Sequence, residues 1–255
     1  MYLSELRFII KPERNKENIL DAIEILFGAL RMNGQIIGKE FPGGYLENTY
    51  YAYLMLPDED SLDLKYSNAY FINALDKLTE NEVSIDISIR GIEPYSAPVC
   101  KCHSPASYIL YTNYTLMESP IRCSDCFGTI PLYKLPIAIN SEYGDILSWE
   151  SDYKACDTLQ MNCSTGERFA ISQMSKYDSS LTKRGLDICK RVNKLAGKPM
   201  YYYLYHPIGR GKKSEMRRKC PSCDDEWLLN EQLYGFVNFK CDKCNLLSNI
   251  AWSTR

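Results

Sequence analysis

Long apolar runs are absent from this 255-residue sequence, and so is a leader-like N-terminus. No stretch approaches the ~20 consecutive apolar residues that a membrane-spanning helix needs, so we expect no membrane insertion. Met1–Glu5 are not a basic segment followed by an apolar run, so we predict no secretory signal and a cytoplasmic location. Because 45% of the residues are hydrophobic, the composition also argues against disorder.

Histidine is scarce, and the common signatures of catalysis are missing. Only His103 and His206 occur, and the sequence shows no paired carboxylates beside a histidine, no nucleophile elbow and no open metal site. Gly209-x-Gly211 is too short to be a phosphate loop. We therefore expect a non-enzymatic protein in which His206 has a capping or packing role.

Cysteine, in contrast, is abundant, with eleven in the chain. In a reducing compartment, closely spaced cysteines more often hold metal than form disulfides. Cys220-x-x-Cys223 and Cys241-x-x-Cys244 are separated by 17 residues, within the spacing typical of paired C-x-x-C zinc sites. Four thiolates fill the tetrahedral shell of Zn²⁺, so we predict a structural zinc site in a C-terminal ribbon.

A second group of cysteines lies upstream. Cys100, Cys102, Cys123 and Cys126 are predicted to bind a second zinc ion. The first pair is C-x-C, so sets in which His103 replaces Cys100 or Cys102 stay open. The competing interpretation is a redox dithiol at the second pair, but the proline-containing segment that follows does not resemble the helix that such a motif usually begins.

The fold class predicted from the pattern of apolar residues is α+β. Residues 1–96 are predicted to form a ferredoxin-like βαββαβ sandwich, in which two helices cover one face of a four-stranded antiparallel sheet. The expected strands are 2–10, 35–41, 49–56 and 83–89, with helices at 18–32 and 68–78 and a turn at 42–44. The predicted open face carries no RNA-stacking motif.

The rest of the chain is predicted to form three segments. Residues 97–138 are a zinc-ribbon-like β segment, residues 139–198 are mostly helical, and residues 199–255 are the C-terminal zinc ribbon with a basic approach. The cysteines without a partner at useful spacing are predicted to be buried thiols, because free cysteine is among the most buried residue types. They are Cys156, Cys163 and Cys189.

The net charge of −2 conceals an asymmetry along the chain. Residues 1–97 carry a net charge of −7, residues 98–197 carry +1 and residues 198–255 carry +4. Six cations lie directly before the C-terminal cysteines Cys220–Cys244, and they are candidate phosphate-binding residues. They are Arg210, Lys212, Lys213, Arg217, Arg218 and Lys219. The alternative is a solvated basic loop that offsets the charge of about −2 on a Zn(Cys)₄ centre.

Several motifs in the second half of the chain resemble a known family. They are the run Pro199–Tyr205, the Cys-Pro-Ser-Cys motif of Cys220–Cys223 leading into Trp227, the segment from Phe239 to Trp252, and the upstream segments Cys123–Cys126 and Pro131–Pro136. Together they are similar to a proteobacterial family of uncharacterised zinc-ribbon-containing proteins for which nucleic-acid binding is suggested. One departure is Asp224, which stands where a glycine commonly follows the second cysteine.

Two functions follow as hypotheses. In the first, the protein binds zinc and contacts nucleic acid through its basic C-terminal ribbon, as the resemblance also implies. In the second, it is a protein-binding module, such as an immunity protein that neutralises a nuclease toxin through the acidic N-terminal domain and its Asp58–Asp63 loop.

Overall fold

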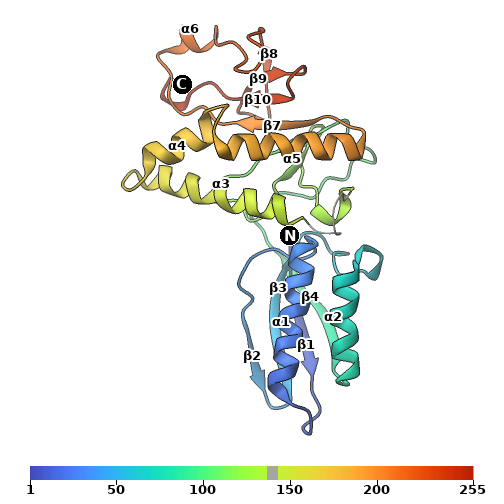
Figure 1. Ribbon diagram of the computed structural model, residues 1–255. Helices are drawn as coiled ribbons and strands as arrows, with labels where there is room; N and C mark the ends of the chain where they lie inside the picture. The colour runs from blue at the N-terminus through green and yellow to red at the C-terminus, as the bar shows by residue number, and fades with distance from the viewer. Residues whose placement is uncertain (137–142, 255) are drawn as a thin grey trace. The chain divides into compact units, whose positions relative to one another are not determined.

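The computed structural model describes residues 1–136 and 143–254 and forms two compact units, each with its own sheet (Figure 1). The first unit comprises Met1–Val99, Met117–Ser119 and Gly128–Gly144, and the second comprises Cys100–Leu116, Pro120–Phe127 and Asp145–Arg255. Residues 137–142, where the helical segment was predicted to begin, and the side chain of Trp252 lie outside the described part. The two mixed units confirm the predicted α+β class.

The first unit contains the element order βαββαβ. Its elements are β1 (Tyr2–Ile9), α1 (Lys16–Met32), β2 (Gly43–Leu46), β3 (Thr49–Leu56), α2 (Ala69–Glu80) and β4 (Ser84–Ile92), with a short 3₁₀ helix η1 (Leu64–Tyr66). The strands are antiparallel in the order β2-β3-β1-β4. The helices α1 and α2 cover one face of this sheet (Figure 1).

Local sequence signals explain α1. The side chain of Asn15 accepts hydrogen bonds from the backbone N–H groups of Glu17 and Asn18, which the first helical turn cannot satisfy internally. Residues three and four apart along the helix are apolar, so one face is buried against the sheet. The resulting core includes Leu6, Phe8, Ile19, Ile23, Leu26, Leu30, Ala52, Leu54, Phe71 and Leu78.

The second strand lies later in the chain than the sequence predicted. Residues 35–41 form no strand: Gln35 is fully buried and donates from Nε2 to the carbonyl of Ser61 at 2.7 Å, and Ile37 makes only an isolated bridge to Met55. Gly38 has φ +106°, which interrupts an extended run. The segment predicted as the turn is instead β2, which the two residues 47–48 connect to β3.

The second unit is built around a six-stranded mixed sheet. Its strands are β5 (Tyr108–Leu110), β6 (Ile121–Cys123), β7 (Met200–Leu204), β8 (Leu228–Leu233), β9 (Val237–Cys241) and β10 (Leu246–Ser248), in the order β6-β5-β7-β10-β9-β8. Its helices are α3 (Gly144–Asn162), α4 (Glu167–Ser175), α5 (Ser180–Ala196) and α6 (Lys212–Glu215), and it ends in η3 (Trp252–Thr254). The remaining element, η2 (Leu132–Lys134), belongs to the first unit. One sheet thus joins strands from two segments that the sequence predicted separately.

The central strand β7 is buried along its whole length, as expected for a parallel strand covered on both faces. On one face, Tyr202 contacts Trp149 of α3, and Gly185 of α5 lies directly against the Tyr202 ring. On the other face, Tyr201 and Tyr203 enter an apolar cluster with residues of β5, β9 and β10. No helix in the described part of the chain is both long and apolar enough to cross a membrane.

Candidate metal centres

The upstream cysteines converge at one end of the β5–β6 hairpin. Cys100 and Cys102 come from the loop before β5, Cys123 is the last residue of β6, and Cys126 follows after two residues. One sulfur atom from each lies within 4.8 Å of the others, so the four could hold a metal ion. His103 is exposed and lies outside this group.

The downstream cysteines form a matching group. Cys220 and Cys223 precede β8, Cys241 ends β9, and Cys244 precedes β10. Their four sulfur atoms also lie within 4.8 Å of one another, and those of Cys223 and Cys241 are 3.6 Å apart. A tetrahedral centre with metal–sulfur bonds of about 2.3 Å needs sulfur–sulfur distances of about 3.8 Å, and the separation of Cys223 and Cys241 is close to that value.

A left-handed residue follows the second cysteine of every C-x-x-C motif. Phe127, Asp224 and Asn245 have φ angles of 58°, 60° and 51°. The backbone N–H of Phe127 donates to the carbonyl of Cys123, and that of Asp224 donates to Cys220, each at 2.9 Å. The turn therefore forms without glycine, and Asp224 preserves it because aspartate is one of the residues that tolerate this conformation.

Burial favours the neutral thiol at two of these positions. It raises the pKa of Cys100 and the pKa of Cys241 above the ordinary value for cysteine. A bound divalent cation reverses this preference because it stabilises the thiolate. All eleven cysteines are free of disulfides, so every candidate ligand has its sulfur available.

Aromatic contacts connect the two cysteine groups. Tyr234 lies in the β8–β9 turn, where its own φ of 51° and that of Gly235, 75°, form the tight reversal. Its ring stacks on Phe127, with centroids 4.4 Å apart, and Phe236 contacts Phe127 edge-on. The sequence predicted both groups but had no signal for this contact between them.

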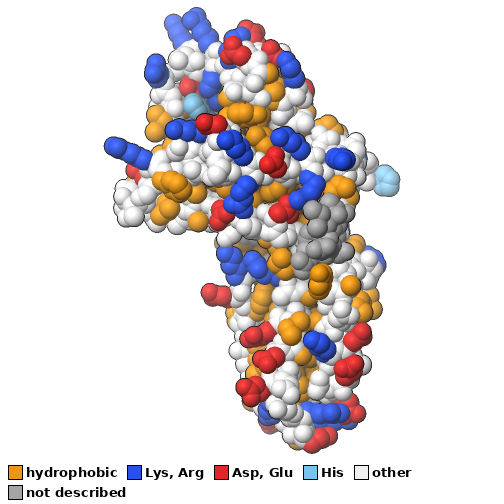
Figure 2. All heavy atoms as spheres, in the orientation of Figure 1, with side chains coloured by type: hydrophobic (Ala, Val, Ile, Leu, Met, Phe, Trp, Pro, Cys, Tyr) orange, Lys and Arg blue, Asp and Glu red, His pale blue; other side chains and the backbone are white. Residues whose placement is uncertain are grey.

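The basic segment divides into exposed and internally bound cations. Arg210, Lys212, Lys213 and Arg217 are exposed, and Figure 2 shows Lys and Arg side chains projecting around α6 at the top of the view. A cavity of about 670 Å³ is lined by four cations of this segment, which are Arg210, Lys213, Arg217 and Arg218. With Lys219, five of the six predicted phosphate-binding residues are thus exposed.

Arg218, in contrast, is half-buried and forms hydrogen bonds within the second unit. Its Nη2 donates to Ser248 Oγ at 3.0 Å and to the carbonyl of Asn249 at 2.8 Å. Its guanidinium carbon lies 4.4 Å from the ring centre of Phe239 and 5.0 Å from that of Trp227. Because these contacts hold its charge beside the ribbon core, Arg218 differs from the exposed cations with which the sequence grouped it.

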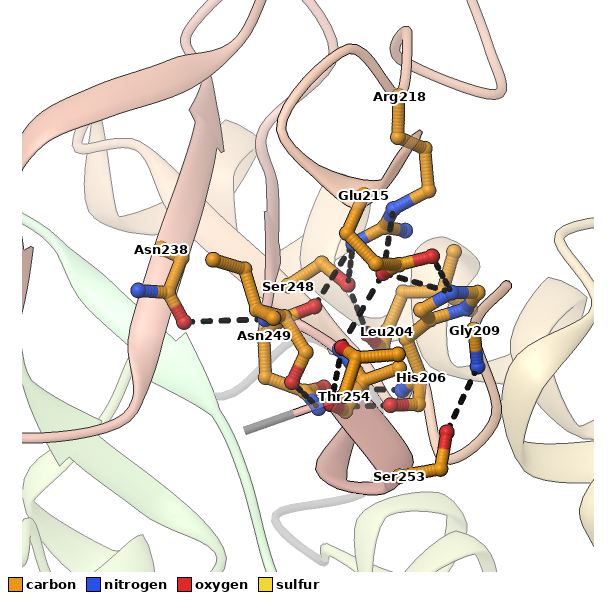
Figure 3. Close-up of polar contacts among 12 residues, drawn as sticks. Leu204, His206, Gly209, Glu215, Arg218, Asn238, Ser248, Asn249, Ser253 and Thr254 are labelled. Atoms are coloured by element: carbon orange, nitrogen blue, oxygen red, sulfur yellow. Dashed lines mark hydrogen bonds and ion pairs between the residues drawn. The ribbon is translucent and has the colours of Figure 1, made fainter. Parts of the chain in front are cut away.

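A buried carboxylate accompanies Arg218. Glu215 is 5% exposed and lies between His206 and Arg218 in Figure 3. The His206 Nε2 atom is 3.1 Å from Glu215 Oε2, and that oxygen also accepts from the N–H of Ala251. Burial lowers the pKa of His206, with the Arg218 charge adding to the effect. The capping or packing role of His206 stays a prediction.

Lys219 and the acidic loop of the first unit are both engaged in ion pairs. Lys219 Nζ is 3.1 Å from Glu226 Oε1.

The aspartates of the acidic loop pair with two lysines of the first unit. Lys134 Nζ is 2.7 Å from Asp58 Oδ2, while Lys65 Nζ is 2.7 Å from Asp63 Oδ2 and 3.2 Å from Asp60 Oδ2. The loop therefore offers less free negative charge than its sequence indicates.

The three remaining cysteines differ in burial. Cys156 and Cys189 are buried, as predicted. The prediction for Cys163 is wrong, because this residue is exposed. It follows the last residue of α3 with φ +50°, and its thiol donates to the carbonyl of Gln160 at 3.3 Å, so it lies outside the regular helix.

The fold and these sites define an α+β protein with two four-cysteine groups able to hold metal. Residues 1–88, 102–205 and 209–254 match three families, each described as a domain of unknown function (DUF8589, DUF2310 and DUF8594, respectively). An uncharacterized protein of Haemophilus influenzae is 34% identical over 99% of both chains. The chain belongs to the family of that protein.

Other similarities are more restricted. A second uncharacterized protein of Haemophilus influenzae is 38% identical over 59% of this chain and 74% of its own. The relatives are therefore uncharacterised and proteobacterial, as the resemblance predicted. A solved chain from Deinococcus radiodurans, named as an antibiotic biosynthesis monooxygenase, is 13% identical over 40% of this chain and 100% of its own, with a TM-score of 0.26. That score is too low to support an argument about fold or activity.

Proposed function

We propose that this protein is a non-enzymatic zinc protein that binds nucleic acid through the exposed cations around α6. The observation that carries the proposal is the position of these cations directly before the downstream cysteine group. A rigid metal-bound ribbon gives a basic surface a defined shape without requiring a large core.

The donor sets support zinc as the metal. Each group offers four sulfur atoms and no carboxylate, and soft thiolate ligands in a tetrahedral arrangement select Zn²⁺ over Mg²⁺ or Ca²⁺. A closed four-thiolate shell leaves no position for substrate, so a structural role is the one that this chemistry favours.

Support for the nucleic-acid site comes from charge and accessibility. Arg210, Lys212, Lys213 and Arg217 are exposed, and each phosphate that they neutralise would release a condensed counterion. Arg218 contributes indirectly, because it fastens the end of this segment to Ser248 and Asn249.

The first unit is proposed to be a ferredoxin-like scaffold. The order β2-β3-β1-β4 and the position of both helices on one face support this assignment. The immunity-protein alternative rests on the net charge of −7 in residues 1–97. Pairing of Asp58, Asp60 and Asp63 with lysines of the same unit reduces its support. A pull-down that recovers a basic protein, and loses it when these three aspartates are neutralised, would favour the alternative.

Metal analysis tests the zinc sites. We expect about two zinc ions per chain in purified protein, one for each cysteine group. One zinc ion together with a reactive Cys123 thiol would reject the upstream site and favour the redox interpretation.

Binding of labelled DNA and RNA oligomers, followed by fluorescence anisotropy at several salt concentrations, tests the nucleic-acid site. The test variant combines Lys212→Glu, Lys213→Glu and Arg217→Glu, and its matched control combines Lys176→Glu, Lys183→Glu and Lys194→Glu, which are exposed elsewhere in the same unit. We expect the test variant alone to lose binding, with the salt slope on B-DNA falling by about 0.9 for each lost contact. Equal loss in both variants, or binding insensitive to salt, would contradict the proposal.

A further inference from the structure

A second cavity in the same unit has a different chemical character. Its volume is about 540 Å³, within the range of small-molecule sites. Tyr111 directly follows β5 and Tyr205 directly follows β7, and these two strands are parallel neighbours, so their carboxyl ends meet at this cavity. In open sheets with parallel strands, ligands bind outside these carboxyl ends.

Aromatic rings form much of the cavity wall. The ring of Tyr111 lies 5.2 Å from that of Tyr203 and 5.1 Å from that of Phe236, and Tyr203 and Phe236 are 5.3 Å apart. Tyr153 of α3 and Tyr205 add two further rings to the lining. The face of an aromatic ring carries partial negative charge, so a wall of this kind attracts cations.

One buried carboxylate supplies the only formal charge among the described residues that line the cavity. Asp157 of α3 is 8% exposed and accepts a hydrogen bond from the backbone N–H of Tyr114 at 2.8 Å. No Lys, Arg or His is among the described residues that line the cavity, and no ion pair of Asp157 occurs in the described chain. Burial raises the pKa of Asp157, and the hydrogen bond from the Tyr114 N–H partly offsets this increase. No cation among the described residues contributes to the shift.

A second polar group in the lining has no hydrogen-bond partner within the described residues. Thr112 is 2% exposed, and its Oγ1 atom has no hydrogen-bond partner in the described chain. Buried polar atoms in native proteins are almost always hydrogen-bonded, so a buried carboxylate without a counter-charge and a buried hydroxyl without a partner at one cavity indicate a missing ligand.

We propose that this cavity binds a small organic cation, an amine or quaternary ammonium attached to an apolar body, with its charge beside Asp157 and against the tyrosine faces. The cation supplies the counter-charge that the protein does not, and the ring faces replace part of its hydration. An anion has no favourable partner here, because the lining carries one negative charge and no positive one. The site is thus separate in chemistry from the basic surface around α6, and it does not depend on nucleic-acid binding.

Binding of small probes to the full-length protein tests the proposal by isothermal titration and ligand-detected NMR. The probes are phenethylammonium and benzyltrimethylammonium, with 2-phenylethanol as the neutral analogue, phenylacetate as the anionic analogue and guanosine as a nucleobase probe. We expect both cations to bind at least about tenfold more tightly than 2-phenylethanol, and phenylacetate to bind more weakly still.

Two variants assign the binding to this cavity. Asp157→Asn keeps the shape and the acceptor for Tyr114, and we expect it to lower the affinity for both cations about tenfold or more without lowering the melting temperature, since it removes an unpaired buried charge. Tyr205→Leu retains an apolar side chain but removes one ring face, and we expect it to weaken benzyltrimethylammonium binding. Asp187→Asn, at a side chain that is 74% exposed in α5, is the matched control and leaves binding unchanged.

Several results would overturn the proposal. Equal affinity for 2-phenylethanol and the cations would show a merely apolar cavity, and stronger binding of guanosine that depends on Asp157 would assign the cavity to a nucleobase. Failure of every probe to bind up to its solubility, or full cation binding by both Asp157→Asn and Tyr205→Leu, would reject a cation site here.

Discussion

The hydroxyl group of Tyr234 donates a hydrogen bond to the carbonyl oxygen of Ser124 at 2.5 Å. Ser124 lies inside the Cys123–Cys126 motif, while Tyr234 turns the hairpin that carries the downstream cysteine Cys241. The two candidate metal centres are therefore linked by a contact of a side chain that belongs to neither. We expect this contact to couple the centres, so that a change at the hairpin turn is detected at the upstream centre.

Removing the hydroxyl of Tyr234 tests that coupling. We expect Tyr234→Phe to lower the free energy of unfolding of the second unit by about 1 kcal/mol, the net value of one hydrogen bond. Tyr234→Leu should cost a further ~0.5–1.5 kcal/mol, because it also removes the stacking on Phe127. Denaturant unfolding followed by tryptophan fluorescence reports on this unit, since all three tryptophans lie in it.

The rate of zinc release from the upstream centre is a second measurement of the effect of Tyr234. Both Tyr234 variants should lose zinc from the Cys123 centre more rapidly than the wild-type protein, measured with a colorimetric chelator. Unchanged release rates in Tyr234→Leu would show that the contact has no effect on the upstream centre.

Single cysteine substitutions separate the two centres. We expect Cys123→Ser and Cys241→Ser each to remove about one zinc ion per chain, because three thiolates and a hydroxyl bind zinc more weakly than four thiolates. Cys163→Ser changes an exposed thiol outside both groups and should leave the metal content unchanged. Elemental analysis of the purified variants measures the outcome, and retention of both ions in either ligand variant would contradict the assignment.

His206 predicts a pH dependence of stability. Burial lowers its pKa in the folded state, so the unfolded chain binds the proton more readily. The stabilising contribution is present above the unfolded pKa of about 6.5 and is lost as the pH falls below it, by at most about 1.4 kcal/mol per pH unit.

The measurement is the free energy of unfolding between about pH 5 and 8 in the wild-type protein and in His206→Gln. The glutamine side chain stays neutral, so the variant should show a smaller decrease toward low pH. Parallel pH profiles for the two proteins would show that another group is responsible.

Substitution by alanine should change stability in opposite directions at two glycines. A Cβ atom at Gly185 would overlap the ring of Tyr202 and approach Trp149 Nε1, so we expect Gly185→Ala to destabilise the second unit by about 1–3 kcal/mol. Gly28 lies in α1, and a Cβ there would meet no atom within 4 Å. Gly28→Ala should therefore stabilise the first unit by about 0.5–1 kcal/mol.

Thermal melts followed by circular dichroism and by tryptophan fluorescence distinguish the two effects. Only Gly185→Ala should shift the fluorescence transition, because the tryptophans lie in the second unit. A stabilising effect of Gly185→Ala would contradict this prediction, because it would show that α5 can move away from Tyr202 of β7 without a loss of stability.

Much of the first unit could be predicted because its signals are local. Alternation in β1 and β4, the apolar stripe of α1 and the cap at Asn15 all act within a few residues. The lack of a strand at 35–41 could not be predicted, since Gln35 there donates to the carbonyl of Ser61 in another segment of the chain. The sequence also gave no indication that Lys65 and Lys134 neutralise the acidic loop.

The cysteine groups show the same division. The spacing within each C-x-x-C motif, and the turn that follows it, are properties of adjacent residues, so the sequence by itself indicated the six cysteines of these motifs, while it left Cys100 and Cys102 open to replacement by His103. Tertiary structure decided the rest: it excluded His103 from the upstream group, bound the half-buried Arg218 to Ser248 while its neighbours stayed exposed, and joined both groups through one sheet. These outcomes depend on strand pairing and side-chain packing between distant segments, and no local pattern encodes which distant surface a side chain will meet.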